Sequence, residues 1–163
     1  MAEAIEITPE MRAQIGVESD PRPYEVTATG VRAFARGVGY TDPVYYDTGA
    51  AQAAGYQQLP APPCYLGTPV YLPGQSDEVF STPPGSGPRP RYGLADVLDG
   101  STEAVYERPL LVGETFMTSH RLVDLQVKQS RALGAMLIVS AETTFRDGEG
   151  KVAARERSQY IFY

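Results

Sequence analysis

The spacing of apolar residues changes from an extended to a helical pattern near the start of the chain. In PYEVTA (residues 23–28) apolar and polar residues alternate, whereas Val31, Phe34 and Val38 recur at i, i+3 and i+7. Alternation is typical of a strand and the second spacing of a helix. The pattern therefore predicts a short strand followed by a helix over about residues 30–38, whose three apolar side chains face a sheet.

The last third of the chain has an extended pattern throughout. Residues 102–129, 133–147 and 151–163 are rich in Val, Ile, Thr, Tyr and Phe, which favours strands. The turn RDGEGK at 146–151 supplies an aspartate and two glycines that tolerate positive φ. We therefore expect a meander that, with the earlier strand, forms an antiparallel sheet of about five strands against one helix, an α+β arrangement.

Proline dominates the middle of the chain. A second short helix is expected within residues 47–56, but nine of the fourteen prolines then lie between 60 and 90. This density excludes a continuous helix or a central strand. It predicts an irregular Pro/Gly-rich excursion over about residues 60–92, ordered until about Phe80 and mobile over about 81–90.

Length and composition limit the classes of function. A chain of 163 residues is the size of a single domain, so residues 1–163 are assigned to one. The net charge of −6 argues against nucleic acid as a partner. No membrane span, basic leader or phosphate-binding glycine loop is present, so a cytoplasmic protein without a nucleotide cofactor is expected. A single cysteine excludes an internal disulfide and disfavours a metal site.

Three short motifs and their separations carry a family resemblance. AGY at 54–56, APP at 61–63 and RPLLVGET at 108–115, in this order of elements, resemble the MaoC-like hydratases and dehydratases of the hotdog fold. The closest likeness is to their N-terminal dehydratase-like module, which includes the smaller subunits of (3R)-hydroxyacyl thioester dehydratases. The resemblance covers about residues 16–163 and implies a sheet wrapped around a central helix, assembled as a dimer or a dimer of dimers.

The motif that carries catalysis in this family is altered here. Catalytic members have G-D-x-N-P-x-H after the central helix, where Asp and His hold the water that adds to an enoyl thioester. At the matching positions of GYTDPVY, Tyr40 replaces Asp, Tyr45 replaces His, and Asp42 stands where the family has Asn. Tyrosine has an ordinary pKa of about 10 and is a poor base at neutral pH. The resemblance therefore implies a module without the family's catalytic pair.

Three interpretations remain open. In the simplest, the chain is the substrate-tunnel subunit of a heteromeric enoyl-CoA hydratase or 3-hydroxyacyl thioester dehydratase, a lyase whose Asp and His belong to a catalytic hotdog partner. In the second, it is a stand-alone dehydratase or cyclase of secondary metabolism, a homodimer in which Tyr40 or Tyr45 acts as an acid. Asp42 would then become the base if burial raised its pKa. The third is a non-enzymatic acyl-binding or scaffolding protein.

The resemblance also implies a substrate, an acyl thioester of coenzyme A or acyl carrier protein, with no metal or redox cofactor. Arg89 and Arg91 are candidates for contacts with the phosphates of coenzyme A, although a pair of solvated loop arginines is the more ordinary interpretation. The residues expected to contact the substrate surround the altered motif and follow the APP motif: Tyr40, Asp42, Tyr45, Tyr46, Pro62, Pro63, Cys64 and Tyr65.

Each candidate also has a structural interpretation. Seven of the eleven tyrosines lie between positions 40 and 92, and they could line a tunnel or simply cover the central helix. Asp42 precedes a proline and is equally suited to an Asx turn. Cys64 has no histidine near it in sequence, which favours a buried structural thiol. His120, the sole histidine, lies within a strand and is expected at the surface or an interface.

Overall fold

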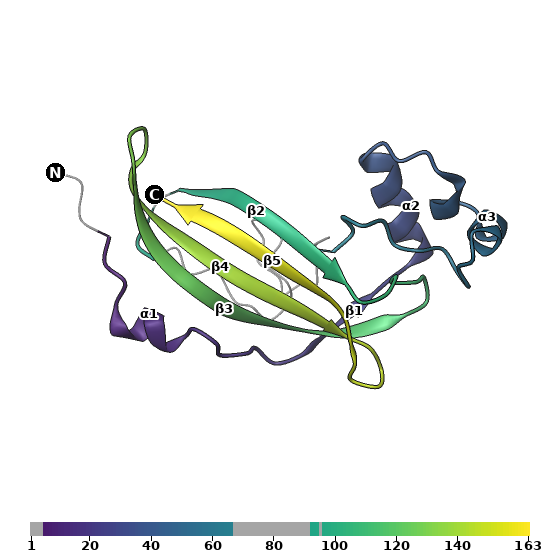
Figure 1. Ribbon diagram of the computed structural model, residues 1–163, viewed down its shortest axis with the longest axis horizontal. Coiled ribbons are helices and arrows are strands. Elements are labelled where there is room, and N and C mark those ends of the chain that lie inside the picture. Colours follow the sequence, from purple (N-terminus) through teal and green to yellow (C-terminus); the bar gives the residue numbers. More distant parts are fainter. Residues whose placement is uncertain (1–4, 67–91, 95) are drawn as a thin grey trace.

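The computed structural model describes residues 5–66, 92–94 and 96–163, and Figure 1 shows their arrangement. The predicted order and mobility of the excursion fall mostly on residues 67–91 and lie outside the described residues. The elements along the chain are α1 (Pro9–Ala13), β1 (Arg22–Glu25), α2 (Ala28–Gly37), a 3₁₀-helix η1 (Pro43–Tyr45), α3 (Thr48–Ala53), β2 (Val97–Tyr106), β3 (Thr115–Ser130), β4 (Gly134–Arg146) and β5 (Val152–Phe162).

The strands form one antiparallel sheet in the order β1-β3-β4-β5-β2. The α+β class and the five-stranded antiparallel sheet predicted from the sequence are thereby confirmed. The β4–β5 turn also forms as predicted, because Oδ1 of Asp147 accepts hydrogen bonds of 3.0 Å from the backbone N–H groups of Glu149 and Lys151. Gly150 supplies the positive φ of 79° that this turn requires.

The inner face of the sheet, defined as the face that carries Phe116 and Phe145, holds the core. Side chains of paired residues in antiparallel strands point to the same face, and the register places two apolar clusters on it. The first lies toward β1 and includes Val31 of α2, and the second lies toward the other end and receives Met11 of α1. These two clusters fix the helices against the sheet.

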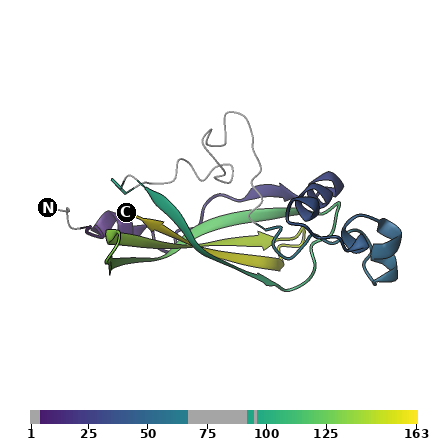
Figure 2. The ribbon, with the colours of Figure 1, turned by 90° about the horizontal axis from the view of Figure 1, so that it is seen from above.

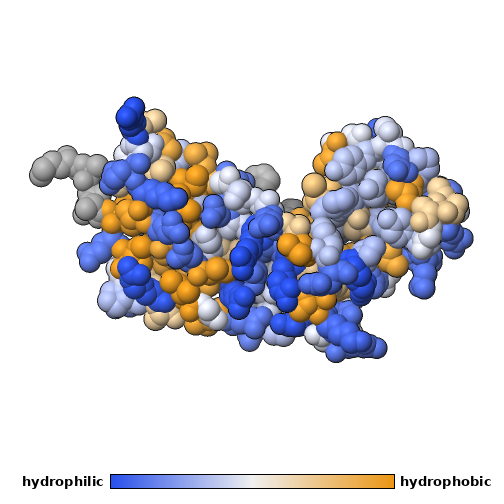
Figure 3. Space-filling view, viewed as in Figure 1, coloured by the Kyte–Doolittle hydropathy of each residue, from blue (hydrophilic) through white to orange (hydrophobic). Residues whose placement is uncertain are grey.

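The opposite, outer face carries an ion-pair row. Glu142 of β4 is only 3% exposed and accepts hydrogen bonds from Arg121 of β3 at 2.5 Å and from Arg157 of β5 at 2.8 Å. Burial alone would raise the pKa of Glu142, but these hydrogen bonds and the positive charges outweigh it and hold that pKa below its usual value. Figure 3 shows hydrophilic side chains gathered across the middle of the sheet.

Helix α2 lies near the end of the sheet where β1 enters, and α3 extends beyond it (Figures 1 and 2). The side chain of Thr27 caps α2 by accepting a 3.1 Å hydrogen bond from the backbone of Gly30. Val31 is fully buried and Phe34 packs against the same cluster, as predicted. The prediction for Val38 is wrong, because this residue is 48% exposed and lies at the C-cap, where the helical turn has already ended.

Candidate functional site

The altered motif folds into a compact turn directly after α2. Gly39 has a φ of 81°, which L side chains rarely adopt, and the backbone of Tyr40 then donates a 2.8 Å hydrogen bond to the carbonyl of Ala35. The rings of Tyr40 and Tyr45 are stacked, with centroids 5.7 Å apart and planes 26° apart. The two side chains that the sequence resemblance matches to the family's catalytic pair therefore pack on each other.

A thiol completes this group. The pKa of Tyr40 is raised, first by a hydrogen bond with the side chain of Cys64 and then by the charge of the same group. Burial is the main cause that raises the pKa of Tyr45, followed by the charges of Asp42, Tyr40, Tyr56 and Cys64. Both phenols are therefore neutral at physiological pH, when they can donate hydrogen bonds but cannot act as bases.

Asp42 has a local structural role. Its Oδ1 accepts a 3.0 Å hydrogen bond from the backbone of Val44 and caps η1, so the Asx turn expected before Pro43 is present. The carboxylate is exposed. The interpretation that makes this chain a stand-alone enzyme requires a buried Asp42, which the structure does not show.

The segment after the APP motif is anchored by aromatic residues. Tyr65 is 4% exposed, and its ring meets Phe34 edge to face at a centroid distance of 5.6 Å. Tyr106 of β2 donates a hydrogen bond to the carbonyl of Pro63. Burial is the main cause that raises the pKa of Tyr106 to about 12. Sequence reasoning missed Tyr106, although its place two residues before RPLLVGET was a signal for contact with the site.

Two motifs of the family resemblance lie side by side in the structure. The backbone of Ala61 donates a 2.7 Å hydrogen bond to the carbonyl of Leu110, and Val112 donates one of 2.9 Å to Leu59. Within the second motif, the Glu114 carboxylate accepts from the backbone of Leu111 at 2.7 Å. An ion pair of 2.8 Å between Arg108 and Glu114 closes the same loop. RPLLVGET thus positions the segment that carries Cys64.

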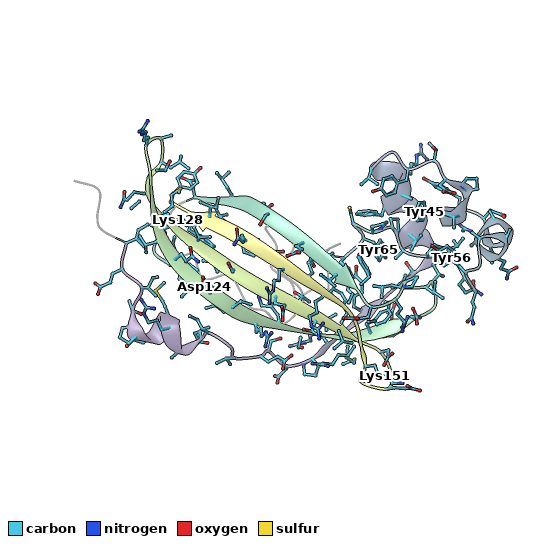
Figure 4. The ribbon with its side chains drawn as sticks, in the orientation of Figure 1. Tyr45, Tyr56, Tyr65, Asp124, Lys128 and Lys151 are labelled. Carbon is cyan, nitrogen blue, oxygen red and sulfur yellow. The ribbon has the colours of Figure 1, made fainter. Side chains whose placement is uncertain are left out.

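The structure brings some of the predicted substrate contacts together and places others apart. Tyr40, Tyr45 and Cys64 come together, and Figure 4 shows Tyr45, Tyr56 and Tyr65 gathered around α2 and α3. Tyr46 points back into the turn, where its hydroxyl donates a 2.5 Å hydrogen bond to the carbonyl of Tyr40. Pro62 and Tyr65 are buried, whereas Pro63 is exposed. Arg89 and Arg91 lie outside the described residues.

One expectation for a single residue is wrong. Cys64 is exposed and not a buried thiol, because its neighbours Pro62 and Tyr65 make the buried contacts of this segment. His120, expected at the surface or an interface, is half-buried on the inner face, where its Nδ1 lies 3.2 Å from Oγ1 of Thr143. Strand alternation from the buried Phe116 indicates this face. No cluster of potential metal ligands occurs among the described residues, and none of their helices is long and apolar enough to cross a membrane.

Comparisons with known proteins agree with this architecture. A family model described as the FAS1-like dehydratase domain region matches residues 13–156. A UPF0336 protein of Clavibacter michiganensis subsp. michiganensis is 31% identical over 144 residues, which cover 88% of this chain and 87% of the relative.

Solved structures with the same fold include two complexes from Mycobacterium tuberculosis. A chain of the ChsH1-ChsH2 complex has a TM-score of 0.68 at 23% identity and covers 90% of this chain and 88% of its own length. A chain of the truncated HadBC (3R)-hydroxyacyl-ACP dehydratase complex has a TM-score of 0.63 at 15% identity, with coverage of 90% and 96%. The hotdog fold expected from the sequence is confirmed. The chain belongs to the FAS1-like dehydratase domain region family, whose model matches most of its length.

Proposed function

We propose that this chain is the substrate-tunnel subunit of a heteromeric enoyl thioester hydratase or 3-hydroxyacyl thioester dehydratase. The catalytic Asp and His would come from a separate hotdog chain, and the substrate would be an acyl thioester of coenzyme A or acyl carrier protein, without a further cofactor. One observation carries the proposal: Tyr40 and Tyr45, at the positions of the catalytic pair, are stacked on each other and have raised pKa values.

The chemistry of the reaction supports a role without proton abstraction. Hydration and dehydration both need a group that accepts a proton near neutral pH. Two phenols with raised pKa values are donors at that pH, and the exposed carboxylate of Asp42 is engaged in a turn. Together with Cys64 they form a polar and aromatic wall, which can border a substrate but cannot activate its water.

The edge of the sheet supports a different chain as the partner. Strand β2 pairs with β5 on one side, and no strand of the described part of the chain pairs with its other side. An open edge invites a further strand. Both charged side chains of β2, Asp99 and Glu103, are acidic, so a partner strand that carries basic side chains would suit this edge. The ChsH1-ChsH2 and HadBC structures are, by their names, complexes of two different chains.

Purification from the native host tests the proposal directly. We expect a second hotdog chain to co-purify, and we expect the isolated chain to hydrate crotonyl-CoA or longer enoyl-CoA no faster than a blank. Adding the partner should produce turnover. As a control, Asp42→Asn should leave the turnover of the complex unchanged, because Asp42 serves a turn. Turnover by the isolated chain at the rate of the complex would contradict the proposal.

A further inference from the structure

A buried carboxyl group lies on the inner face of the sheet, away from the stacked tyrosines of the altered motif. Glu156, in the middle of β5, is 9% exposed. The register pairs it with Thr143 of β4 and Ala104 of β2, so it shares the face of the core residues Phe145 and Ala154. No hydrogen bond or ion pair joins its side chain to any residue that the structure describes.

Small and polar side chains surround this carboxyl group in the sheet. Its neighbours across the sheet are Thr143 and Ala104, and those two positions away along β5 are Ala154 and Ser158. This band separates the two apolar clusters, one built around Phe116 and Phe145 and the other around Leu137 and Phe162. The inner face therefore has a polar strip of short side chains with one long carboxylic side chain at its centre.

Within the described residues, the charge of Glu156 acts on Tyr106, but no hydrogen bond or ion pair accounts for this buried carboxyl group. Glu142, on the neighbouring strand and the opposite face, is also buried but accepts hydrogen bonds from Arg121 and Arg157. A buried polar group without a partner lowers the stability of the folded state. An apolar residue at position 156 would avoid that cost, so the group is better explained by a ligand that supplies the missing partner.

We propose that Glu156 contacts an oxygen atom carried on the acyl chain of the substrate, a hydroxyl or ketone within an otherwise apolar chain. The proposal rests on the function proposed above and narrows its substrate class. Burial raises the pKa of Glu156, which favours the protonated carboxyl group, a hydrogen-bond donor to a ketone or hydroxyl oxygen. The two apolar clusters on either side would contact the carbon segments before and after that oxygen.

His120 and Thr143 extend the same polar row. His120 pairs with Thr143 in the register, and Thr143 pairs with Glu156, so the three residues lie side by side on β3, β4 and β5. Nδ1 of His120 lies 3.2 Å from Oγ1 of Thr143. A hydroxyl group on the ligand could therefore bond to Glu156 and still lie close to a second polar side chain.

Binding of matched ligands tests the contact. The probes are decanoyl-CoA and a set of decanoyl-CoA thioesters with one hydroxyl or keto group at successive chain positions, titrated calorimetrically into the complex with its partner and into the isolated chain. At least one oxygenated probe should bind wild type about two- to tenfold more tightly than decanoyl-CoA. This is the gain in affinity that one neutral hydrogen bond contributes. Glu156→Leu should abolish that preference without weakening decanoyl-CoA, and Glu156→Gln should retain part of it.

The outcomes separate this proposal from the function on which it rests. If decanoyl-CoA binds but no oxygenated probe is preferred, or if the preference survives in Glu156→Leu, the contact is disproved while the thioester function stands. Should Glu156→Leu fail to fold, Glu156→Ala removes the same group. Cyclohexanone and methylcyclohexane form a second pair of probes, which lack coenzyme A. If cyclohexanone raises the melting temperature of wild type, methylcyclohexane does not, and the effect disappears in Glu156→Ala, the contact is supported even if no thioester binds. Equal effects of both fragments would disprove it.

Discussion

The hydroxyl oxygen of Tyr65 lies 2.7 Å from the place that a Cβ atom would occupy on Gly30. Real Cβ atoms do not approach another atom so closely, so the glycine in α2 makes room for the tyrosine. Tyr65 is itself buried among Phe34 and Tyr24. This close contact joins α2 to the segment that carries Cys64.

Gly30→Ala should therefore destabilise the protein by about 1–3 kcal/mol, as overpacking of a buried contact does. Gly37→Ala is the matched control in the same helix, because nothing lies within 4 Å of a Cβ atom placed there. It should stabilise by up to about 1 kcal/mol through helix propensity. Urea denaturation measures both free energies of unfolding.

A double substitution identifies the cause. If the Tyr65 hydroxyl is the obstacle, Gly30→Ala should cost clearly less in a Tyr65→Phe background than in wild type. An equal cost in both backgrounds would instead indicate Thr27, whose Oγ1 lies 2.9 Å from the same position.

The sequence predicts the elements better than their contacts. Alternation and the turn RDGEGK are local signals, and they specify the long strands and the β4–β5 hairpin correctly. The spacing of Val38 continues the helical pattern of α2, but α2 ends at Gly37. Val38 is its C-cap, and the chain turns away at Gly39 with a positive φ. Helix α1 was missed altogether, although Thr8 caps it and Pro9 occupies its first turn.

The parts of the site that the sequence did not reveal depend on contacts between distant segments. Tyr40 and Cys64 are 24 residues apart and meet only through the loop that RPLLVGET holds. Alternation along β5 does place Glu156 on the face of Ala154. That none of the described residues forms a hydrogen bond or ion pair with it, however, can be recognised only once the register with β4 and β2 is known.

Glu156 should make the stability of the protein depend on pH. Burial raises its pKa above the ordinary value of 4.5 in the folded state, so the unfolded chain loses this proton at a lower pH than the folded protein does. Stability should then fall as the pH rises from about 4 through the folded-state pKa. The stability that Glu156→Gln gains over wild type should be larger at about pH 8 than at about pH 4.

Glu142→Gln is the control, because its effect on stability should depend on pH in the opposite direction. The pKa of Glu142 is lowered, so its contribution is present above the ordinary glutamate pKa and is lost as the pH falls through the folded-state value. This variant should be less stable than wild type at neutral pH, with a difference that shrinks in acid. If both variants changed with pH in the same direction, the assignment of a raised pKa to Glu156 would be wrong.

The open edge of β2 predicts where the partner subunit binds. Val105 is 51% exposed on this strand, and a lysine on an edge strand opposes the addition of a further strand. Val105→Lys should therefore raise the dissociation constant of the complex about tenfold or more, because the new charge would be buried against the partner. Analytical ultracentrifugation of the mixed subunits measures this change.

Val17→Lys is the control for that substitution. Val17 is 57% exposed and lies in the N-terminal segment, away from β2, so the same change of charge should leave assembly intact. If both variants assemble like wild type, the partner does not use this edge. Self-association of the isolated chain that is lost in Val105→Lys would instead indicate a homodimer through β2.

Tyr45 should shape the site without taking part in proton transfer. In the assembled complex, Tyr45→Phe should keep turnover within about tenfold of wild type, because one neutral hydrogen bond contributes only about 0.5–1.5 kcal/mol. Its stacking on Tyr40 survives the change. Steady-state hydration of an enoyl-CoA by the mixed subunits measures the effect.

Introducing the family's catalytic pair tests the same idea from the other direction. Tyr40→Asp combined with Tyr45→His should give the isolated chain at most feeble activity. Proximity and orientation account for roughly 7–11 kcal/mol of a typical barrier, and the turn around Asp42 and Cys64 was not built to position the new groups. The idea would be contradicted if Tyr45→Phe lowered turnover of the complex a hundredfold or more, which corresponds to on the order of 3 kcal/mol of transition-state stabilisation. A loss of that size exceeds the worth of a hydrogen bond and would place Tyr45 in the chemical step of this chain.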